Sequence, residues 1–139
     1  MYLFDTNIWL ERLLGQNKAE NVGELLDRIP LDQIFITDFS FHSICIILTR
    51  FNRPQTLVDF VDDVVLHGAI ELLTNRPEET VLVTKAMDRF GLDFDDAYQY
   101  VVAEQNNLRI VSFDRDFDQT PLGRKAPTEL LAEVKSSEL

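Results

Sequence analysis

Short apolar runs alternate with longer amphipathic segments along this chain, and no two runs are separated by a two-residue turn. Antiparallel strands can be joined by such tight turns, whereas parallel strands need a long crossover connection, which is usually a helix. The pattern therefore predicts an α/β fold, a three-layer α/β/α sandwich with a mostly parallel central sheet of four to five strands. We expect strands at residues 1–5, 33–37, 69–73 and 108–114, and a short fifth strand near Leu122 to Lys125.

The segments between these runs carry the boundary signals of helices. Thr6 or Asn7 can cap a first helix that Gly15 ends, because short polar side chains favour helix starts and glycine favours helix ends. Pro54 falls in the first turn of a later helix, where proline is tolerated. The expected helices cover residues 6–16, 19–29, 41–51, 54–68, 77–91, 95–107 and 127–134, and Asp38 or Ser40 can cap the third of them.

The 139 residues fit one domain, which we place at residues 1–135, followed by a frayed C-terminal tail at residues 136–139. The N-terminal segment lacks a basic region and carries an aspartate within its apolar run, so it is a poor secretory signal. No window approaches the roughly 18 apolar residues of a membrane span. The single cysteine, Cys45, excludes an internal disulfide framework. We therefore expect a cytoplasmic protein with no membrane attachment.

The charge balance narrows the functions that this chain can have. The chain has 13 basic and 24 acidic side chains, which give a formal net charge of −11. This excludes a surface that coats nucleic acid, because such a surface needs a stripe of lysine and arginine. An enzyme acting on nucleic acid is still allowed, because carboxylates that bind divalent cations add negative charge, and a bound ion reverses the local field.

Three aspartates from distant positions are predicted to meet at one edge of the sheet. Asp5 ends the first strand, Asp114 follows the fourth strand, and Asp96 lies in the first turn of the helix before that strand. In an alternating fold, helices begin at the edge where the preceding strands end, and ligands bind beyond those carboxyl ends. A helix-flanking role explains Asp5 taken alone, but its agreement with the other two acids favours a shared site.

Clustered carboxylates in a cleft stay ionised only if a cation compensates their charge. Oxygen ligands of this kind favour Mg²⁺ or Mn²⁺, which can activate a water and orient its attack on phosphorus. A zinc site is not indicated, because the two histidines, His42 and His67, stand apart and without cysteine partners. The sequence therefore predicts a site for a hard divalent cation.

Three ordered motifs carry a resemblance to a known family: FDTNIWL after the first strand, DDAYQYVVAEQNNLRIVSFDRDF near the end, and APTELL at the close. With these motifs the chain resembles a PIN domain, in particular the small single-domain kind found as VapC-type toxins of prokaryotic toxin–antitoxin pairs. The resemblance covers nearly the whole chain. It implies a metal-dependent ribonuclease that hydrolyses RNA phosphodiester bonds with Mg²⁺ or Mn²⁺, forms a homodimer and binds an antitoxin protein.

The resemblance also implies a role for each matching residue. The catalytic metal ligands would be Asp5, Asp96 and Asp114. The polar pair Thr6 and Asn7 would hold the first of these acids, and Ser112 takes a hydroxyl position that is usually threonine.

Two features leave the ligand set open. Asp116 matches a further acid that many members carry, and both metal binding and an ordinary loop role fit it. The family also has a glutamate in the helix after the second strand, where this chain has Ser43 or His42. Asp38, near the start of that helix, is the nearest acid, although its spacing does not match.

Two other functions fit parts of the pattern. A PIN-fold RNA- or protein-binding module with a degenerate catalytic site would account for the missing helix glutamate. A phosphatase with an aspartyl nucleophile is suggested by Asp5 at a strand end. Phosphatases of that kind carry a second aspartate two residues later, where this chain has Asn7.

Overall fold

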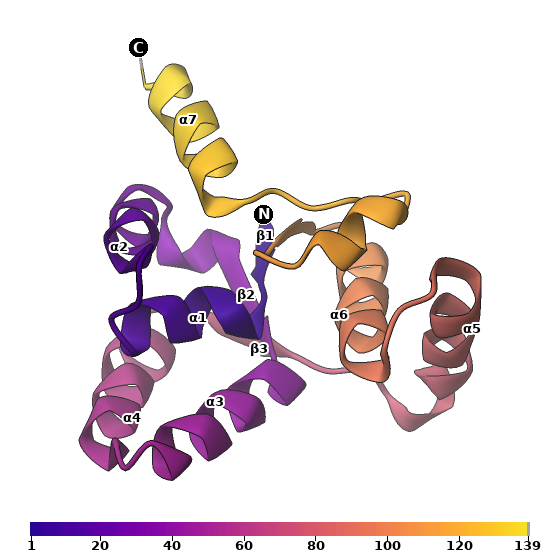
Figure 1. Ribbon diagram of the computed structural model, residues 1–139, viewed down its shortest axis with the longest axis horizontal. Coiled ribbons are helices and arrows are strands. Elements are labelled where there is room, and N and C mark those ends of the chain that lie inside the picture. The colour runs from indigo at the N-terminus through magenta and orange to yellow at the C-terminus, as the bar shows by residue number, and fades with distance from the viewer. Residues whose placement is uncertain (139) are drawn as a thin grey trace.

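A computed structural model describes residues 1–138 and contains one parallel sheet within that range (Figure 1). Its strands are β1 (Tyr2–Phe4), β2 (Ile34–Thr37), β3 (Glu71–Leu73) and β4 (Arg109–Val111). They lie in the order β3-β2-β1-β4, and all of the pairings between them are parallel. The prediction of a mostly parallel central sheet is confirmed.

The fifth strand expected near Leu122 to Lys125 is reduced to a single parallel bridge. Lys125 pairs with Val111, and its amide nitrogen donates to the carbonyl oxygen of Ile110 at 2.8 Å. The pairing extends no further, because the chain turns at Gly123, with φ +62°, and starts a helix at Pro127. The named sheet therefore has four strands.

The helices lie close to the positions that the sequence predicts. Their bounds are α1 (Thr6–Leu13), α2 (Ala19–Arg28), α3 (Asp38–Arg50), α4 (Pro54–Phe60), α5 (Thr80–Phe90), α6 (Phe94–Gln105) and α7 (Pro127–Ser137). A π-helical segment, η2 (Val61–Leu66), continues α4, and 3₁₀ turns form η1 (Leu31–Gln33), η3 (Pro77–Glu79) and η4 (Arg115–Gln119). None of the helices within residues 1–138 has the length and apolar character needed to cross a bilayer.

Two helix boundaries differ from the expectation. Helix α3 begins at Asp38 and is capped by Thr37, one residue before the nearer of the two expected caps, because the Thr37 side chain accepts a hydrogen bond from the Ser40 amide at 3.0 Å. Helix α7 continues to Ser137, so part of the expected tail is helical, and Leu139 lies outside the described residues. An ion pair between Lys135 and Glu24 at 2.8 Å joins α7 to α2.

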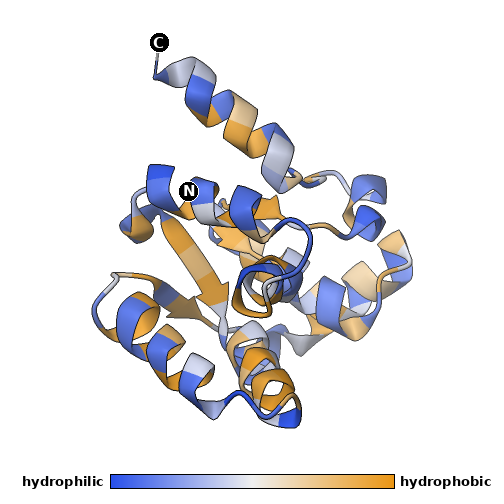
Figure 2. Ribbon diagram, turned by 60° about the vertical axis from the view of Figure 1, so that its left-hand side comes forward, coloured by the Kyte–Doolittle hydropathy of each residue, from blue (hydrophilic) through white to orange (hydrophobic). Residues whose placement is uncertain are grey.

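Strands β1, β2 and β4 are largely buried, as expected for parallel strands, whereas the edge strand β3 is more exposed. Phe4, Ile34 and Ile36 face one apolar cluster, which includes residues of α1, α2, α3, α4 and α7. Leu3 and Ile110 point the other way, into a second cluster formed with α5 and α6. Figure 1 shows these two groups of helices on opposite sides of the strands, and Figure 2 shows the apolar strands between them. The molecule is a three-layer α/β/α sandwich.

The topology sets one edge of the sheet apart. Strands β1 and β2 lead directly into α1 and α3 at their carboxyl ends, and η4 follows β4 at the same edge. Gly91, with φ +65°, ends α5 and allows the chain to reverse into α6, whose start is bonded to residues just after β3. The first turn of α6 therefore lies at this edge as well.

Candidate metal-binding site

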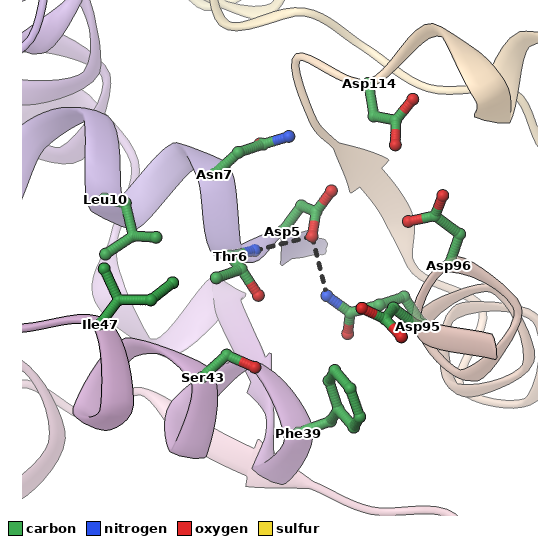
Figure 3. Close-up of a pocket in the computed structure, with 11 residues that line it drawn as sticks. Asp5, Thr6, Asn7, Leu10, Phe39, Ser43, Ile47, Asp95, Asp96 and Asp114 are labelled. Atoms are coloured by element: carbon green, nitrogen blue, oxygen red, sulfur yellow. Dashed lines mark hydrogen bonds between the residues drawn. The ribbon is translucent and has the colours of Figure 1, made fainter. Parts of the chain in front are cut away.

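A cavity of about 270 Å³ opens at the carboxyl edge of the sheet, between the starts of α1, α3 and α6 (Figure 3). It brings together the three aspartates that the sequence predicted to converge. Figure 3 shows the carboxylates of Asp5, Asp96 and Asp114 directed toward a common space from three separate elements. The lining residues are Asp5, Thr6, Asn7, Leu10, Phe39, Ser43, Ile47, Asp95, Asp96, Gln99 and Asp114.

Asp5 links β1 to α1 and is only 8% exposed. Its Oδ1 accepts hydrogen bonds from the Thr6 amide at 2.7 Å and from Gln99 Nε2 at 3.1 Å. Its Oδ2 accepts from Ser112 Oγ at 2.7 Å. Burial raises the pKa of the Asp5 carboxyl above its ordinary value, while these three donors act in the opposite direction. The donors also hold both oxygens in one orientation.

Asp96 lies in the first turn of α6, close to two further carboxylates. One oxygen from each of Asp96, Asp114 and Asp116 lies within 4.8 Å of the other two. Burial, followed by the negative charges of Asp114 and Asp5, raises the pKa of Asp96 to about 7. This acidic group could hold a metal ion, because a cation would remove the repulsion that favours the protonated form.

The loop after β4 places Asp114 and Asp116 beside each other. Asp114 caps η4, since its Oδ1 accepts a hydrogen bond from the Asp116 amide at 2.8 Å. Its own amide donates to Ser112 Oγ at 2.9 Å. Asp116, which the sequence left open between metal binding and a loop role, is exposed but lies within reach of the same ion as Asp114.

Thr6, Asn7 and Ser112 connect the ends of β1 and β4. Asn7 Nδ2 donates to Ser112 Oγ at 3.3 Å, and Asn7 Oδ1 accepts from the Phe113 amide at 3.3 Å. Thr6 Oγ1 donates to Ser40 Oγ at 2.8 Å, which ties α1 to α3. These contacts fit the supporting role expected for the three polar residues.

The structure places the three candidate residues of α3 in different surroundings. Ser43 lines the cavity, on the same helix face as Phe39 and Ile47, four residues to either side. Asp38 turns away, where its oxygens accept hydrogen bonds from Tyr98 Oη at 2.8 Å and from Thr74 Oγ1 at 3.1 Å. His42 is exposed and packs beside Phe41, with ring centroids 5.8 Å apart.

Two polar residues that line the cavity, the buried Gln99 and the exposed Asp95, were not among the candidates from the sequence. Gln99 Nε2 donates to Asp5 and also to Ser40 Oγ at 2.6 Å, so it bridges α6, α3 and the end of β1. Asp95, a second acid in the first turn of α6, also lines the cavity. The spacing of Asp96 and Gln99, three residues apart on one helix face, was the available signal.

The chemistry of the lining suits a hard cation. Among residues 1–138, the lining of this cavity contains carboxylate, hydroxyl and amide groups and no histidine or cysteine. Oxygen-only ligands of this kind are typical of Mg²⁺ and Mn²⁺ sites, which also keep coordinated waters. The cavity leaves room for such waters and for part of a substrate.

Comparison with known proteins identifies the family. The model of the PIN domain family matches residues 2–122, and the chain therefore belongs to the PIN domain family. No curated protein matches the sequence.

Solved structures share this fold at low sequence identity. A toxin–antitoxin complex from Klebsiella pneumoniae matches with a TM-score of 0.72 and 17% identity, covering 91% of this chain and 98% of that chain. FitAcB from Neisseria gonorrhoeae matches with a TM-score of 0.72 and 19% identity over 92% and 99% of the two chains. PAE2754 from Pyrobaculum aerophilum has a TM-score of 0.67 and 20% identity over 97% and 96%. At these identities the likeness shows the fold alone.

Proposed function

We propose that this protein is a ribonuclease that depends on Mg²⁺ or Mn²⁺ and hydrolyses RNA phosphodiester bonds. One observation carries the proposal: carboxylates from the end of β1, the start of α6 and the segment after β4 surround one cavity in a PIN domain. Asp5, Asp96 and Asp114 would hold the cation, and Asp116 is the further carboxylate within reach.

The residues of the site are suited to different parts of this task. Asp5 is buried and fixed by three donors, so it offers the cation an oriented ligand. Asp96 carries a proton for part of the time near neutral pH, and it must release that proton to bind a cation. A cation held by Asp5, Asp96 and Asp114 would supply a polarised water for attack on phosphorus and positive charge to stabilise the leaving oxygen. Ser112 and Asn7 keep the ends of β1 and β4 together, so the ligands stay in register.

A second candidate function rests on Ser43. This residue lines the cavity from α3, on the helix where the family carries a glutamate. A hydroxyl adds no negative charge, so a second cation would be held weakly, and a PIN-fold binding module without catalysis fits this feature. The nuclease is favoured because carboxylates from three separate elements still converge on one cavity.

Cleavage of labelled RNA by the purified protein tests the nuclease directly. We expect cleavage with Mn²⁺ or Mg²⁺ and none with EDTA. Asp96→Asn should lower the rate on the order of 100-fold or more, since metal-ligand interactions contribute several kcal/mol to transition-state stabilisation. The matched control is Asp88→Asn, which changes an exposed acid on α5 and should leave the rate unchanged. Equal cleavage by wild type and Asp96→Asn would exclude this assignment of ligands.

We further propose that the protein is the toxin of a toxin–antitoxin pair, acting as a homodimer in the cytoplasm. The matching complex from Klebsiella pneumoniae, whose title names a toxin and an antitoxin, supports this proposal. Expression should arrest growth, and co-expression of the adjacent reading frame should relieve the arrest. Growth arrest that persists in Asp96→Asn would argue against a nuclease toxin.

A further inference from the structure

Three aromatic rings form a cluster at the edge of the sheet, and we call Phe39, Phe94 and Tyr98 the rim aromatic cluster. The ring centroids of Phe39 and Tyr98 are 5.7 Å apart, those of Phe94 and Tyr98 are 6.0 Å apart, and those of Phe39 and Phe94 are 6.3 Å apart. All three pairs are tilted rather than stacked, so each ring presents part of a face or an edge outward.

The rim aromatic cluster adjoins the acidic cavity. Phe39 itself lines that cavity, and Figure 3 shows its side chain reaching from α3 toward Asp95 on α6. Phe94 immediately precedes Asp95 and Asp96 in the first turn of α6. Phe94 does not line the cavity itself, but its ring lies 6.3 Å from that of Phe39, which does, so a group bound against Phe94 would lie one ring away from the cavity.

Hydrogen bonds hold the base of the cluster in place. Tyr98 Oη donates to Asp38 Oδ1 at 2.8 Å and accepts from the Asn75 amide at 3.0 Å. Asn75 Nδ2 also donates to the Tyr98 carbonyl oxygen at 3.2 Å. These contacts join α3, α6 and the segment after β3, so the Tyr98 ring is fixed before any ligand arrives. They also give Asp38 a structural role outside the metal cavity.

Phe94 is the most exposed member of the rim aromatic cluster. It is 41% exposed, whereas Phe39 and Tyr98 are half-buried and contribute to packing. A large aromatic side chain this exposed contributes less to the core than its buried neighbours, yet its position beside the acids gives it access to a bound chain. Aromatic side chains bind unpaired bases by stacking, and each stacked base contributes about 1–3 kcal/mol.

We propose that the rim aromatic cluster stacks an unpaired base of the RNA next to the scissile phosphodiester, with Phe94 as the contacting ring. The proposal rests on the nuclease function above and assigns Phe94 as the residue that would hold one unpaired base of the RNA. A base within a duplex is already stacked on its neighbours and is not available to Phe94. Phe94 would therefore select for unpaired segments without reading a particular base through hydrogen bonds.

The test compares variants of Phe94 on RNA of randomised sequence, offered single-stranded and as an annealed duplex, with Mn²⁺. Phe94→Ala should raise KM for the single strand by about 5- to 150-fold, which corresponds to the energy of one stacked base. Its kcat should change little, because the carboxylates are intact. Phe94→Trp should keep KM near the wild-type value, and Phe94→Leu should resemble Phe94→Ala, because it keeps apolar area but has no aromatic face.

Phe51→Ala is the matched control, since Phe51 is also an exposed phenylalanine, 62% exposed, at the far end of α3. It should leave KM unchanged. An unchanged KM in Phe94→Ala, or an equal rise for the duplex and the single strand, would overturn the proposal. So would a change confined to self-association in light scattering, which would make the cluster a protein interface.

A binding measurement distinguishes failure of the stacking proposal from failure of the proposed nuclease function. Fluorescence anisotropy with a labelled single-stranded RNA measures binding to Asp96→Asn and to the double variant with Phe94→Ala, in Mg²⁺ buffer. If the wild type cleaves no RNA but the double variant binds about 5-fold or more weakly, the nuclease fails and the stacking site stands. If the wild type cleaves RNA and neither KM nor binding depends on Phe94, only the stacking site fails.

Discussion

Asp5 and Asp96 face the same cavity, but their surroundings support them differently. Asp5 is nearly buried and receives three hydrogen-bond donors, so its oxygens are held in place even though burial disfavours its charge. Asp96 is half-buried, and its neighbours Asp114 and Asp5 are themselves acids. As proposed ligands, Asp5 would be the fixed one, and Asp96 would be the one whose charge depends most on a bound cation.

The pH dependence of stability tests the state of Asp96. Its pKa is raised to about 7 in the folded protein from 3.8, so the native state binds this proton more tightly than the unfolded chain. Its contribution to stability is therefore present at low pH and is lost as the pH rises toward 7. In EDTA, we expect wild type to lose on the order of 1 kcal/mol more than Asp96→Asn between pH 5.5 and pH 8, with allowance for solvent screening.

Thermal unfolding measures this effect: the change in Tm between pH 5.5 and pH 8 is compared between wild type and Asp96→Asn. One kcal/mol corresponds to roughly 3–4 °C in Tm for a domain of this size. The comparison with Asp96→Asn removes the contributions of the other titrating groups, which both proteins share. A pH-dependent change of Tm that is the same in both would show that Asp96 titrates normally.

At the scale of elements, helix α3 determines which side chains line its side of the cavity. Its residues at four-residue spacing, Phe39, Ser43 and Ile47, face the cavity, while His42 is exposed and Asp38 is bonded to Thr74 and Tyr98. The helix therefore brings apolar groups and one hydroxyl to a site whose other walls carry carboxylates. Position 43 is the place on α3 where an added acid would reach the site.

Ser43→Glu tests this geometry. A carboxylate at position 43 should tighten Mn²⁺ binding by about tenfold or more, about 1.4 kcal/mol, or add a second bound ion. The matched control is His42→Glu, which adds an acid on the exposed face of the same helix and should change Mn²⁺ binding little. Isothermal titration calorimetry gives both the affinity and the number of ions. Equal effects of the two substitutions would mean that only net charge matters.

At the scale of the whole molecule, the apolar core stabilises the folded protein, whereas the acidic edge of the sheet destabilises it. The sheet is covered by apolar side chains on both faces, which stabilises the fold through burial. The carboxyl edge gathers like charges in a protein that already has a net charge of −11. The core tolerates this repulsion, and a cation would relieve it.

Metal should therefore stabilise the folded protein as a whole. At a cation concentration about 100 times the Kd, binding to the native state alone adds about 2.7 kcal/mol, and EDTA should remove this gain. Thermal unfolding of wild type, Asp96→Asn and Asp88→Asn in Mg²⁺ measures the effect, which only Asp96→Asn should lack. Without such stabilisation, and without RNA cleavage, the binding-module function would be favoured.

Much of this architecture could be predicted from the amino-acid order. The spacing of apolar runs and helical segments leads to a parallel sheet, and the rule for helix and strand ends leads to one shared edge. Asp5, Asp96 and Asp114 could be placed there because each adjoins an element boundary, where position follows from topology. The cap of α3 was expected at Asp38 or Ser40 and is Thr37, because several neighbouring polar residues could have made this local contact.

The direction of side chains and the pairing of distant groups were decided only by the tertiary structure. The sequence by itself determined the layers, the shared edge and the acids that lie on it, because these follow from local periodicity and chain connectivity. It could not show that Gln99 bonds to Asp5, that Asp38 turns to Tyr98, or that Asp116 lies beside Asp96. Those contacts depend on how α3, α6 and the β4 loop pack against one another, and packing is a property of the whole chain.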